Sequence, residues 1–246
     1  MTTSEIWHCR LGHPSSHHMT HISALPCKSP TTICSICPLA KQHRLSFPVS
    51  SSRVNKPFEL LHADIWGPYR TTPYDGYKLF LSIVDDFSRA TWIFLMSHKS
   101  NAFSLLESFI LFVANQFDAQ VKIIRSDNGQ EFGDNHAIAF YTSKGIIHQT
   151  SCVDTPQQNG IVERKHKQLL EVARALMFQS KVPLKFWGDC VLTATYLVNR
   201  LPHSAINFKT PYEVLFSKPP SYEHLKVFGC LCFISTLRQG RTKFEP

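Results

Sequence analysis

The chain has 246 residues, 43% of them hydrophobic, and its 26 Lys and Arg against 18 Asp and Glu give a net charge of +8. This hydrophobic content excludes wholesale disorder, and no apolar run approaches the roughly 20 residues that a membrane-spanning helix needs. Residues 1–10 lack the apolar core of a signal peptide. The sequence therefore predicts a soluble, intracellular protein with no membrane partner.

The charge is divided unevenly along the chain. Residues 1–60 carry +4, residues 61–170 carry −1, and residues 171–246 carry +5. Basic flanks suit a polyanionic partner, whereas acidic side chains in the middle suit metal ions, which invert the local electrostatics. Scattered, solvated lysines would give the same totals, so charge alone does not decide between these interpretations.

Composition also divides the chain into parts. A Cys- and His-rich head is predicted at residues 1–45, a main body at 58–200 and an extension of that body at 201–246. Between head and body, residues 46–57 contain two prolines and four serines without a helical period, which is typical of a linker.

Five strands are predicted in the body, from apolar runs at 58–66, 77–84, 90–96, 121–126 and 146–150. Helices are expected at 100–117 with Ser100 as its N-cap, at 135–144 ended by Gly145, at 158–179 and at 184–199. This order implies an α/β fold, with a mixed five-stranded sheet flanked by helices. In the extension, Thr210-Pro211 and 218–220 indicate turns, and 226–235 indicates a strand.

Three carboxylates are candidates for a catalytic metal site. Asp64 comes late in the first strand and Asp127 ends the fourth, each just before a glycine turn, while Glu163 opens the long helix. Carboxylates at strand ends project into a crevice, and oxygen ligands of this kind suit Mg²⁺. Two such ions about 4 Å apart would support phosphoryl transfer. Taken singly, each acid could instead be an ordinary turn or cap residue.

Three other acids compete with this set. Asp85 and Asp86 fall between the second and third strands, where Arg89 can pair with them, so we interpret them as structural. Glu131, four residues after Asp127 in an expected loop, is the weaker candidate.

In the head, Cys34 and Cys37 have the C-x2-C spacing of a tetrahedral zinc site. A segment of this size buries little core, so a structural metal is physically expected. Two further ligands must come from the upstream histidines, which are His8, His13, His17, His18 and His21. Helix geometry alone favours a pair at i, i+4, either His13 with His17 or His17 with His21.

The long helix is amphipathic. Its expected inward stripe comprises Val162, Leu169, Val172, Ala173, Leu176 and Met177. Lys167 lies one turn beyond Glu163, and Arg164, Lys165 and His166 flank it, so these cations are candidates to hold DNA phosphates. Asn159, in the polar stretch before Glu163, is a further candidate for a DNA contact. A solvated basic face is the alternative.

Several motifs together resemble the integrase region of copia-type retrotransposon polyproteins. They are I-W-H-C-R-L-G-H, H-A-D-I-W-G-P, V-D-D-F-S-R, R-S-D-N-G-Q-E-F, P-Q-Q-N-G-I-V-E-R-K-H-K, K-T-P-Y-E-V-L-F and H-L-K-V-F-G-C. The resemblance implies a ribonuclease-H-like core whose metal-binding triad is Asp64, Asp127 and Glu163.

For the head, the resemblance selects His8 and His13 to join Cys34 and Cys37 at one zinc ion. Because Pro14 suits a first helical position, we expect His13 at a helix start and His8 in the segment before it.

The implied function is DNA integration, in which 3′-hydroxyl ends of double-stranded element cDNA are joined to target DNA. The resemblance also implies two Mg²⁺ or Mn²⁺ ions per active site, one structural Zn²⁺ and a homo-oligomer. It further implies a nuclear location, reached through a cytoplasmic particle. One alternative is a non-catalytic DNA-binding remnant, since the chain begins at the zinc head and stops at K-F-E-P. Another is a stand-alone ribonuclease-H-like nuclease, which leaves the zinc head unexplained.

One position departs from the family pattern. Relatives commonly carry Gly before K-T-P-Y-E, where this chain has Phe208, which calls the local loop geometry into question.

Overall fold

The structure is a computed structural model that describes residues 3–25, 34–40, 54–71, 74–151 and 159–232. The chain separates into two compact units, Met1–Ser51 and Ser52–Pro246. The division falls within the stretch predicted as a linker, although residues 41–53 lie outside the described part. The domain boundaries of the sequence analysis otherwise stay predictions. Among the described helices, none is long and apolar enough to cross a membrane.

The first unit is helical, with α1 at Thr3–Arg10, α2 at Ser16–Thr20 and α3 at Ile36–Ala40. One expectation is wrong: His13 does not begin a helix but lies between α1 and α2 with φ +60°, whereas His8, in the last turn of α1, does lie in the segment before it. Helix α2 begins only at Ser16, because the side chain of Ser15 caps it by accepting a hydrogen bond from the His18 amide. Pro14 therefore precedes the cap instead of occupying the first helical position.

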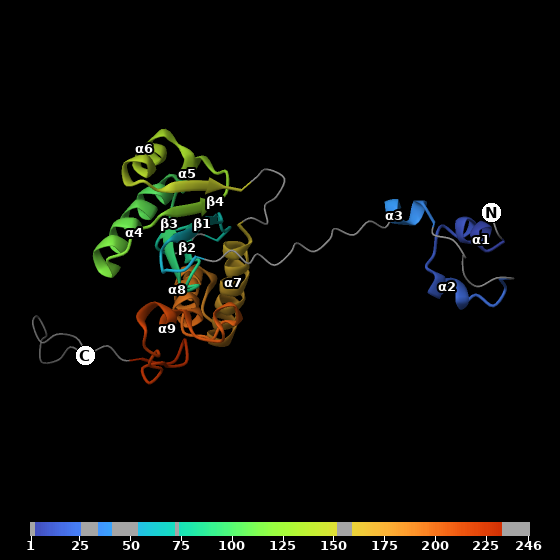
Figure 1. Cartoon of the computed structure of the whole chain (residues 1–246). Coiled ribbons are helices and arrows are strands. Elements are labelled where there is room, and N and C mark those ends of the chain that lie inside the picture. Colours follow the sequence, from blue (N-terminus) through green and yellow to red (C-terminus); the bar gives the residue numbers. More distant parts are fainter. Residues whose placement is uncertain (1–2, 26–33, 41–53, 72–73, 152–158, 233–246) are drawn as a thin grey trace, which may run out of the picture. The chain divides into compact units, whose positions relative to one another are not determined.

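The second unit contains the predicted mixed five-stranded sheet, with strand order β3-β2-β1-β4-β5 (Figure 1). The strands are β1 (Leu60–Trp66), β2 (Leu79–Asp85), β3 (Thr91–Met96), β4 (Ile123–Ser126) and β5 (Ile147–Thr150). The three leading strands pair antiparallel, whereas β1 and β4, and then β4 and β5, pair parallel. All five strands were predicted to within two residues at each end.

Alternation along β1 divides the sheet into two packed faces. Leu61 and Ala63 belong to a core that includes residues of α4 (Ala102–Phe117), α5 (Gln130–Gly133) and α6 (Asn135–Lys144). Trp66 packs on a second core, formed with α7 (Gly160–Ser180) and α8 (Trp187–Val198). Figure 1 shows α4, α5 and α6 on one side of the sheet and α7 and α8 on the other. His62 and Asp64, which alternate in phase with Trp66, face α7 and α8.

The helices match the predicted ranges with local differences. Lys99–Asn101 forms a short 3-10 helix, so α4 begins at Ala102 and Ser100 is not its N-cap. Helix α5 was not predicted. Residues 184–186 likewise form a 3-10 turn before α8. The inward stripe of α7 is confirmed, because every member of it is buried or packs on the second core.

The extension contains a helix where a turn was expected. Helix α9 spans Pro211–Phe216, and the Thr210 hydroxyl caps it by accepting a hydrogen bond from the Glu213 amide at 3.0 Å. The strand predicted at 226–235 is absent over its described part, residues 226–232, and the remainder lies outside the described residues. Gly229 turns there with φ +83°, and a Cβ on it would lie 2.3 Å from the Cβ of Ser180. This close approach to the end of α7 favours a turn over an extended chain.

The position that departs from the family pattern, Phe208, has the left-handed backbone that favours glycine. Its φ is +59°, and its side chain is 74% exposed, so the ring gains little burial in compensation. A residue with a Cβ in the left-handed conformation destabilises the folded state by roughly 1–2 kcal/mol relative to glycine. Part of this difference is cancelled because an unfolded glycine has more conformational freedom to lose on folding.

We therefore expect Phe208→Gly to stabilise the second unit by about 0.5–1 kcal/mol, which raises its melting temperature by roughly 1–4 °C. Phe208→Ala is the matched control, because it removes the ring but keeps the strained Cβ. An equal gain in both variants, measured by thermal unfolding, would show that the exposed ring and not the backbone is responsible.

Candidate catalytic and zinc sites

Parallel pairing places Asp64 beside Asp127. Leu60 is opposite Ile123, and the same register continues to His62 opposite Arg125. Carried two residues further, it sets Asp64 opposite Asp127, the first residue after β4. Helix α7 supplies the third acid, because Glu163 lies in its first turn. Both Asp127 and Glu163 are exposed, whereas the side chain of Asp64 is only 17% exposed.

Asp127 and Glu163 contribute to the electrostatics of Asp64, but the three carboxylates do not form a close group of metal-binding side chains among the described residues. Burial, which is the largest cause, and the negative charges of Asp127 and Glu163 together raise the pKa of Asp64 to about 7, against the opposing effects of the Ile65 amide and Lys99. The Ile65 amide donates to Asp64 Oδ1 at 2.8 Å. A partly buried acid beside two other carboxylates is an environment that a cation would neutralise.

The loop after β4 brings another acid close to Asp127. A Cβ on Gly129 would lie 2.5 Å from Glu131 Oε2 and 3.0 Å from Asp127 Oδ1, so glycine leaves room for both carboxylates. Asp127 Oδ1 also accepts a hydrogen bond from the Gly129 amide at 3.1 Å. Glu131 forms an ion pair with Lys99 at 3.5 Å. This contact is consistent with its interpretation as the weaker candidate for a metal ligand.

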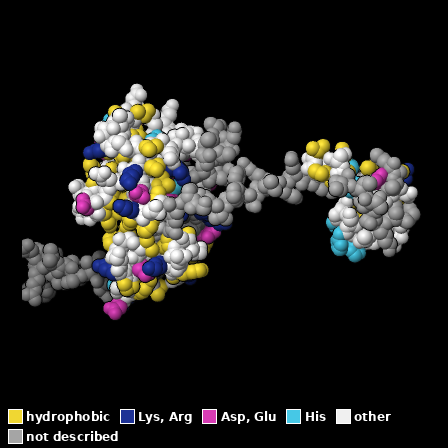
Figure 2. Space-filling model, viewed as in Figure 1, with side chains coloured by type: hydrophobic (Ala, Val, Ile, Leu, Met, Phe, Trp, Pro, Cys, Tyr) yellow, Lys and Arg dark blue, Asp and Glu magenta, His cyan; other side chains and the backbone are white. Residues whose placement is uncertain are grey.

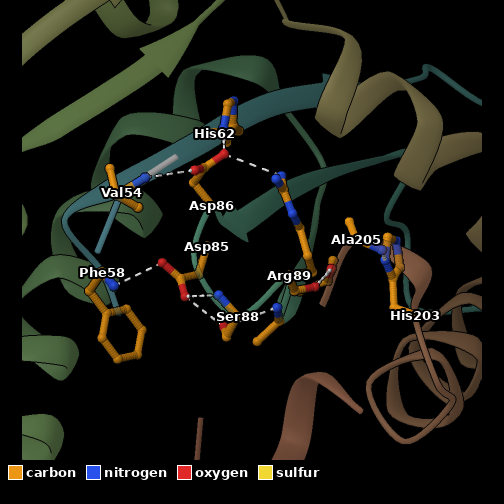
Figure 3. Close-up of polar contacts among 11 residues, drawn as sticks. Val54, Phe58, His62, Asp85, Asp86, Ser88, Arg89, His203 and Ala205 are labelled. Atoms are coloured by element: carbon orange, nitrogen blue, oxygen red, sulfur yellow. Dashed lines mark hydrogen bonds and ion pairs between the residues drawn. The ribbon is translucent and has the colours of Figure 1, made fainter. Parts of the chain in front are cut away.

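The competing acids Asp85 and Asp86 are structural, as interpreted from the sequence (Figure 3). Asp85 accepts hydrogen bonds from the Phe58 amide at 2.8 Å and from the amide and hydroxyl of Ser88 at 2.9 and 2.6 Å. Asp86 pairs with Arg89 at 3.2 Å and accepts a hydrogen bond from His62 Nε2 at 3.0 Å. Burial opposes ionisation of Asp86, but the His62 hydrogen bond and the Arg89 charge outweigh it and lower its pKa.

Two of the four candidate DNA contacts are buried. The Asn159 side chain donates to the Ala63 carbonyl at 3.4 Å, and the Lys165 ammonium donates to Gln168 Oε1 at 3.3 Å. These residues are only 3% and 4% exposed, so neither offers its side chain at the surface as expected. Arg164 and Lys167 are exposed, so they remain candidates for DNA contacts.

His166 also differs from the expectation of a flanking cation. It is buried, and burial lowers its pKa to about 4, so it is neutral at physiological pH. Its Nε2 contacts the hydroxyl of Ser82 in β2, and its Nδ1 lies 3.7 Å from Asp64 Oδ2. Ser82 had not been singled out from the sequence. The signal that could have found this contact is the helical phase, because residue 166 falls between Val162 and Leu169 on the inward stripe.

In the first unit, the four expected zinc ligands converge. Ligand atoms of His8, His13, Cys34 and Cys37 all lie within 4.8 Å of one another, and this is the one such group of three or more metal-binding side chains among the described residues. His8 Nε2 is 3.2 Å from Cys37 Sγ, and His13 Nδ1 is 3.1 Å from His8 Nε2 and 3.3 Å from Cys34 Sγ. Tetrahedral bonds of about 2.0–2.3 Å imply ligand separations of roughly 3.3–3.8 Å, so the set fits Zn²⁺.

The histidines favoured by helix geometry alone do not belong to this group. His17 and His21 are close neighbours, with ring centroids 4.7 Å apart, but both are exposed. Histidine side chains gather on one side of the first unit in Figure 2.

Comparison with known families agrees with both units. Residues 54–156 match the Integrase core domain, and residues 1–42 match the GAG-pre-integrase domain. The chain belongs to the integrase family of copia-type retrotransposon Pol polyproteins.

Two relatives illustrate the extent of this similarity. The Pol polyprotein from transposon TNT 1-94 of Nicotiana tabacum is 35% identical over 98% of this chain, and that from transposon RE2 of Arabidopsis thaliana is 36% identical over 99%. The chain spans 18% and 17% of their lengths. Among solved structures, a simian T-cell lymphotropic virus intasome in complex with the PP2A regulatory subunit B56 gamma matches with a TM-score of 0.58. The match has 19% identity and covers 94% of this chain and 85% of that one. This likeness supports the ribonuclease-H-like, integrase-type fold.

The zinc assignment predicts how the four-ligand site responds to substitution. His8→Ala and His13→Ala should each abolish stoichiometric zinc binding and unfold the first unit, because a structural site of this size depends on all its ligands. His17→Ala and His21→Ala are the matched controls and should retain one zinc per chain, as measured by elemental analysis. One zinc per chain in a variant lacking both His8 and His13 would refute the ligand set.

The raised pKa of Asp64 predicts a pH-dependent stability in metal-free buffer. The folded chain keeps the Asp64 proton between about pH 4 and 7, where the unfolded chain loses it, so stability falls as the pH rises across this range. Asp64→Asn escapes this cost. We therefore expect the variant to exceed the wild type at pH 8 by up to about 4 kcal/mol, an advantage that shrinks below pH 7 and vanishes near pH 4.

Urea unfolding over this pH range measures the effect. Glu171→Gln, at an exposed position of α7, is the control and should show no such trend. A difference between Asp64→Asn and wild type that is independent of pH would contradict the prediction.

Proposed function

We propose that this chain is an integrase that joins the 3′-hydroxyl ends of double-stranded element cDNA to target DNA by phosphoryl transfer. The observation that carries the proposal is that Asp64 and Asp127 lie in register toward the ends of β1 and β4, that Glu163 lies in the first turn of α7, and that the charges of Asp127 and Glu163 contribute to the raised pKa of Asp64. Membership of the integrase family supports it. The competing pair Asp85 and Asp86 is occupied by hydrogen bonds from Ser88 and Arg89 of its own turn and from Phe58 and His62, so it does not offer an alternative metal site.

The three carboxylates fit two Mg²⁺ or Mn²⁺ ions. Their oxygens are hard ligands, and Asp64 is held in an environment that disfavours its charge until a cation is present. When bound, such ions lower the pKa of an attacking hydroxyl and stabilise the charge that develops on the phosphate. The role of the chain is to hold the carboxylates in place at the strand ends.

The reaction balances without any covalent link between protein and DNA. The 3′ oxygen of the element end forms a bond to a phosphorus atom of the target strand, and the bond from that phosphorus to the target's own 3′ oxygen breaks. The attacking hydroxyl loses its proton, and the departing oxygen gains one. No serine or tyrosine nucleophile is therefore required.

On the DNA side, the exposed Arg164 and Lys167 flank Glu163 on α7 and are the side chains proposed to hold phosphates near the reacting atoms. The buried Lys165 donates to Gln168 within α7, and the buried Asn159 donates to the Ala63 carbonyl of β1. The basic residues of 1–60 and 171–246 would add salt-dependent contacts that do not depend on sequence.

The proposal includes partners and location. Joining two element ends to one target requires more than one active site, so we propose a homo-oligomer on DNA, with a structural Zn²⁺ in the first unit. The reaction would take place in the nucleus, after passage through a cytoplasmic particle as part of a polyprotein.

A strand-transfer assay with donor DNA ends, plasmid target and Mg²⁺ tests the function. We expect joined product from the wild type and at least a 100-fold loss in Asp64→Asn and in Glu163→Gln, since each removes a metal ligand. The matched control is Glu171→Gln, which makes the same change two turns further along α7 and should keep full activity.

The same assay separates the alternatives. Nicking of plasmid without joining would favour a stand-alone nuclease, and DNA binding without either product would favour a non-catalytic remnant. Undiminished joining by Asp64→Asn or Glu163→Gln would refute the assignment of the carboxylates.

A further inference from the structure

An exposed lysine lies at the edge of the sheet that carries Asp64 and Asp127. Strands β1, β3 and β4 run in the same direction, because β1 and β3 each pair antiparallel with β2, and β1 pairs parallel with β4. The chain therefore leaves all three strands at one edge of the sheet. Asp127 follows β4 at this edge, and Lys99 comes shortly after β3, in the 3-10 turn Lys99–Asn101 that precedes α4.

The loop after β4 holds an acid between Lys99 and Asp127. The Lys99 ammonium lies 3.5 Å from Glu131 Oε1. The other oxygen of Glu131 and Oδ1 of Asp127 lie 2.5 and 3.0 Å from the position that a Cβ on Gly129 would take, so the two carboxylates are neighbours. The charge of Lys99 also reaches Asp64, since it opposes the rise in the pKa of that carboxyl. Lys99 is therefore a cation of the candidate catalytic site.

The ammonium of Lys99 has donors left for a further ligand. Its side chain is 57% exposed, and a lysine ammonium carries three N–H donors, whereas the described ion pair engages a single oxygen of Glu131. An exposed ion pair of this kind is weak, so a phosphate can share the ammonium or displace the carboxylate. Phosphates repeat at every nucleotide. A DNA strand that brings one phosphate to the acids therefore places its neighbours along the same edge.

Lys99 complements the cations of α7. Arg164 and Lys167 flank Glu163 on α7, whereas Lys99 precedes α4, and these two helices cover opposite faces of the sheet (Figure 1). Cations on one side alone would attract DNA without fixing where it crosses the edge. Phosphate contacts from two sides fix the register of a strand, which is how such contacts position a protein on DNA.

We propose that Lys99 is a DNA-binding residue of the catalytic site, where it holds a phosphate next to the one that reacts. The inference rests on the proposed function, because it concerns the same DNA. Lys99 touches substrate in this role, but it transfers no proton and binds no metal. The phosphate belongs either to the element end or to the target strand, and the experiment has one arm for each.

The chain offers a matched control for Lys99. Lys122 forms an ion pair of the same kind with Glu59 at 2.6 Å, and its side chain is 64% exposed. Because Lys122 lies just before β4, it is at the opposite edge of the sheet from Asp127. Lys99→Gln and Lys122→Gln therefore remove the same charge and the same type of ion pair from the two edges. Lys99→Arg keeps the charge at the first edge.

The first arm measures how the full chain binds a donor end in Mg²⁺ at several salt concentrations. The terminal 3′-hydroxyl of this DNA is replaced by hydrogen, so it cannot react. If the phosphate belongs to the element end, Lys99→Gln should weaken binding about tenfold and reduce the slope of log K against log salt concentration by about 1.

The second arm measures strand transfer at increasing concentrations of plasmid target. If the phosphate belongs to the target, Lys99→Gln should raise KM for the plasmid about tenfold and leave kcat nearly unchanged. Lys99→Arg and Lys122→Gln should stay within about threefold of the wild type in both arms.

A third measurement tests the alternative that the substitution damages the metal site. Removing a cation from beside acids makes the site more negative, so Mg²⁺ should bind more tightly. Lys99→Gln should therefore lower the Mg²⁺ concentration that gives half of the metal-induced rise in melting temperature. A higher midpoint would overturn the inference, because the loss would then come from the metal site.

The other outcomes separate this inference from the function on which it rests. Unchanged binding, salt slope and KM in Lys99→Gln, in a chain whose joining Asp64→Asn abolishes, would overturn the role of Lys99 alone. Equal losses in Lys99→Gln and Lys122→Gln would also overturn it, since any exposed lysine would then serve as well. Absence of joining by the wild type would refute the proposed function, and the first arm would still test Lys99 because it needs binding only. Absence of donor binding as well would overturn both.

Discussion

Parallel pairing of β1 with β4 is the constraint on which the proposed catalytic site depends. It sets Asp64 and Asp127 side by side, and packing of α7 on the sheet brings the third acid, Glu163. Asp64 is the buried one of the three acids, and burial is the main cause of its raised pKa. A cation bound at the proposed site would offset the cost of burying this acid, since binding to the folded state alone stabilises it.

The same unit contains buried acids of a different kind, and the contrast explains their roles. Asp85 receives two hydrogen bonds from Ser88 in the turn that follows it and one from the Phe58 amide, and Asp86 receives hydrogen bonds from His62 and Arg89. These carboxylates have partners supplied by the protein, as buried polar groups generally do. Asp64 has the Ile65 amide and the nearby neutral His166, but no cation of the protein forms an ion pair with it among the described contacts. A buried acid whose compensation is incomplete is the better candidate for an external ligand.

The sheet was predictable because its strands are short apolar runs bounded by turns, and the two strand-end acids followed from it. The prediction was wrong where a residue was assigned to the surface from its type and not from its position in the helical period. Lys165 and His166 were grouped with surface cations, although their spacing from Val162 and Leu169 places them on the buried stripe. The signal for α9 was also present, because Thr210 and Glu213 have the spacing of a helix cap, but the Thr-Pro step suggested a turn. The run at 226–232 has strand-like composition, and only the approach of Gly229 to Ser180 shows why it bends.

The zinc ligands show why local spacing could not select among five histidines. His17 and His21 have ideal helical spacing and are near neighbours, but the pair offers two ligands on an exposed surface, and a structural zinc site needs four. His8 and His13 lack that spacing, and they converge because α1 ends between them and the left-handed backbone of His13 turns its ring toward His8. The remaining two ligands come from the start of α3, more than 20 residues away. The choice of ligands therefore depends on how distant segments of the chain fold together, and helical spacing within one segment does not predict this.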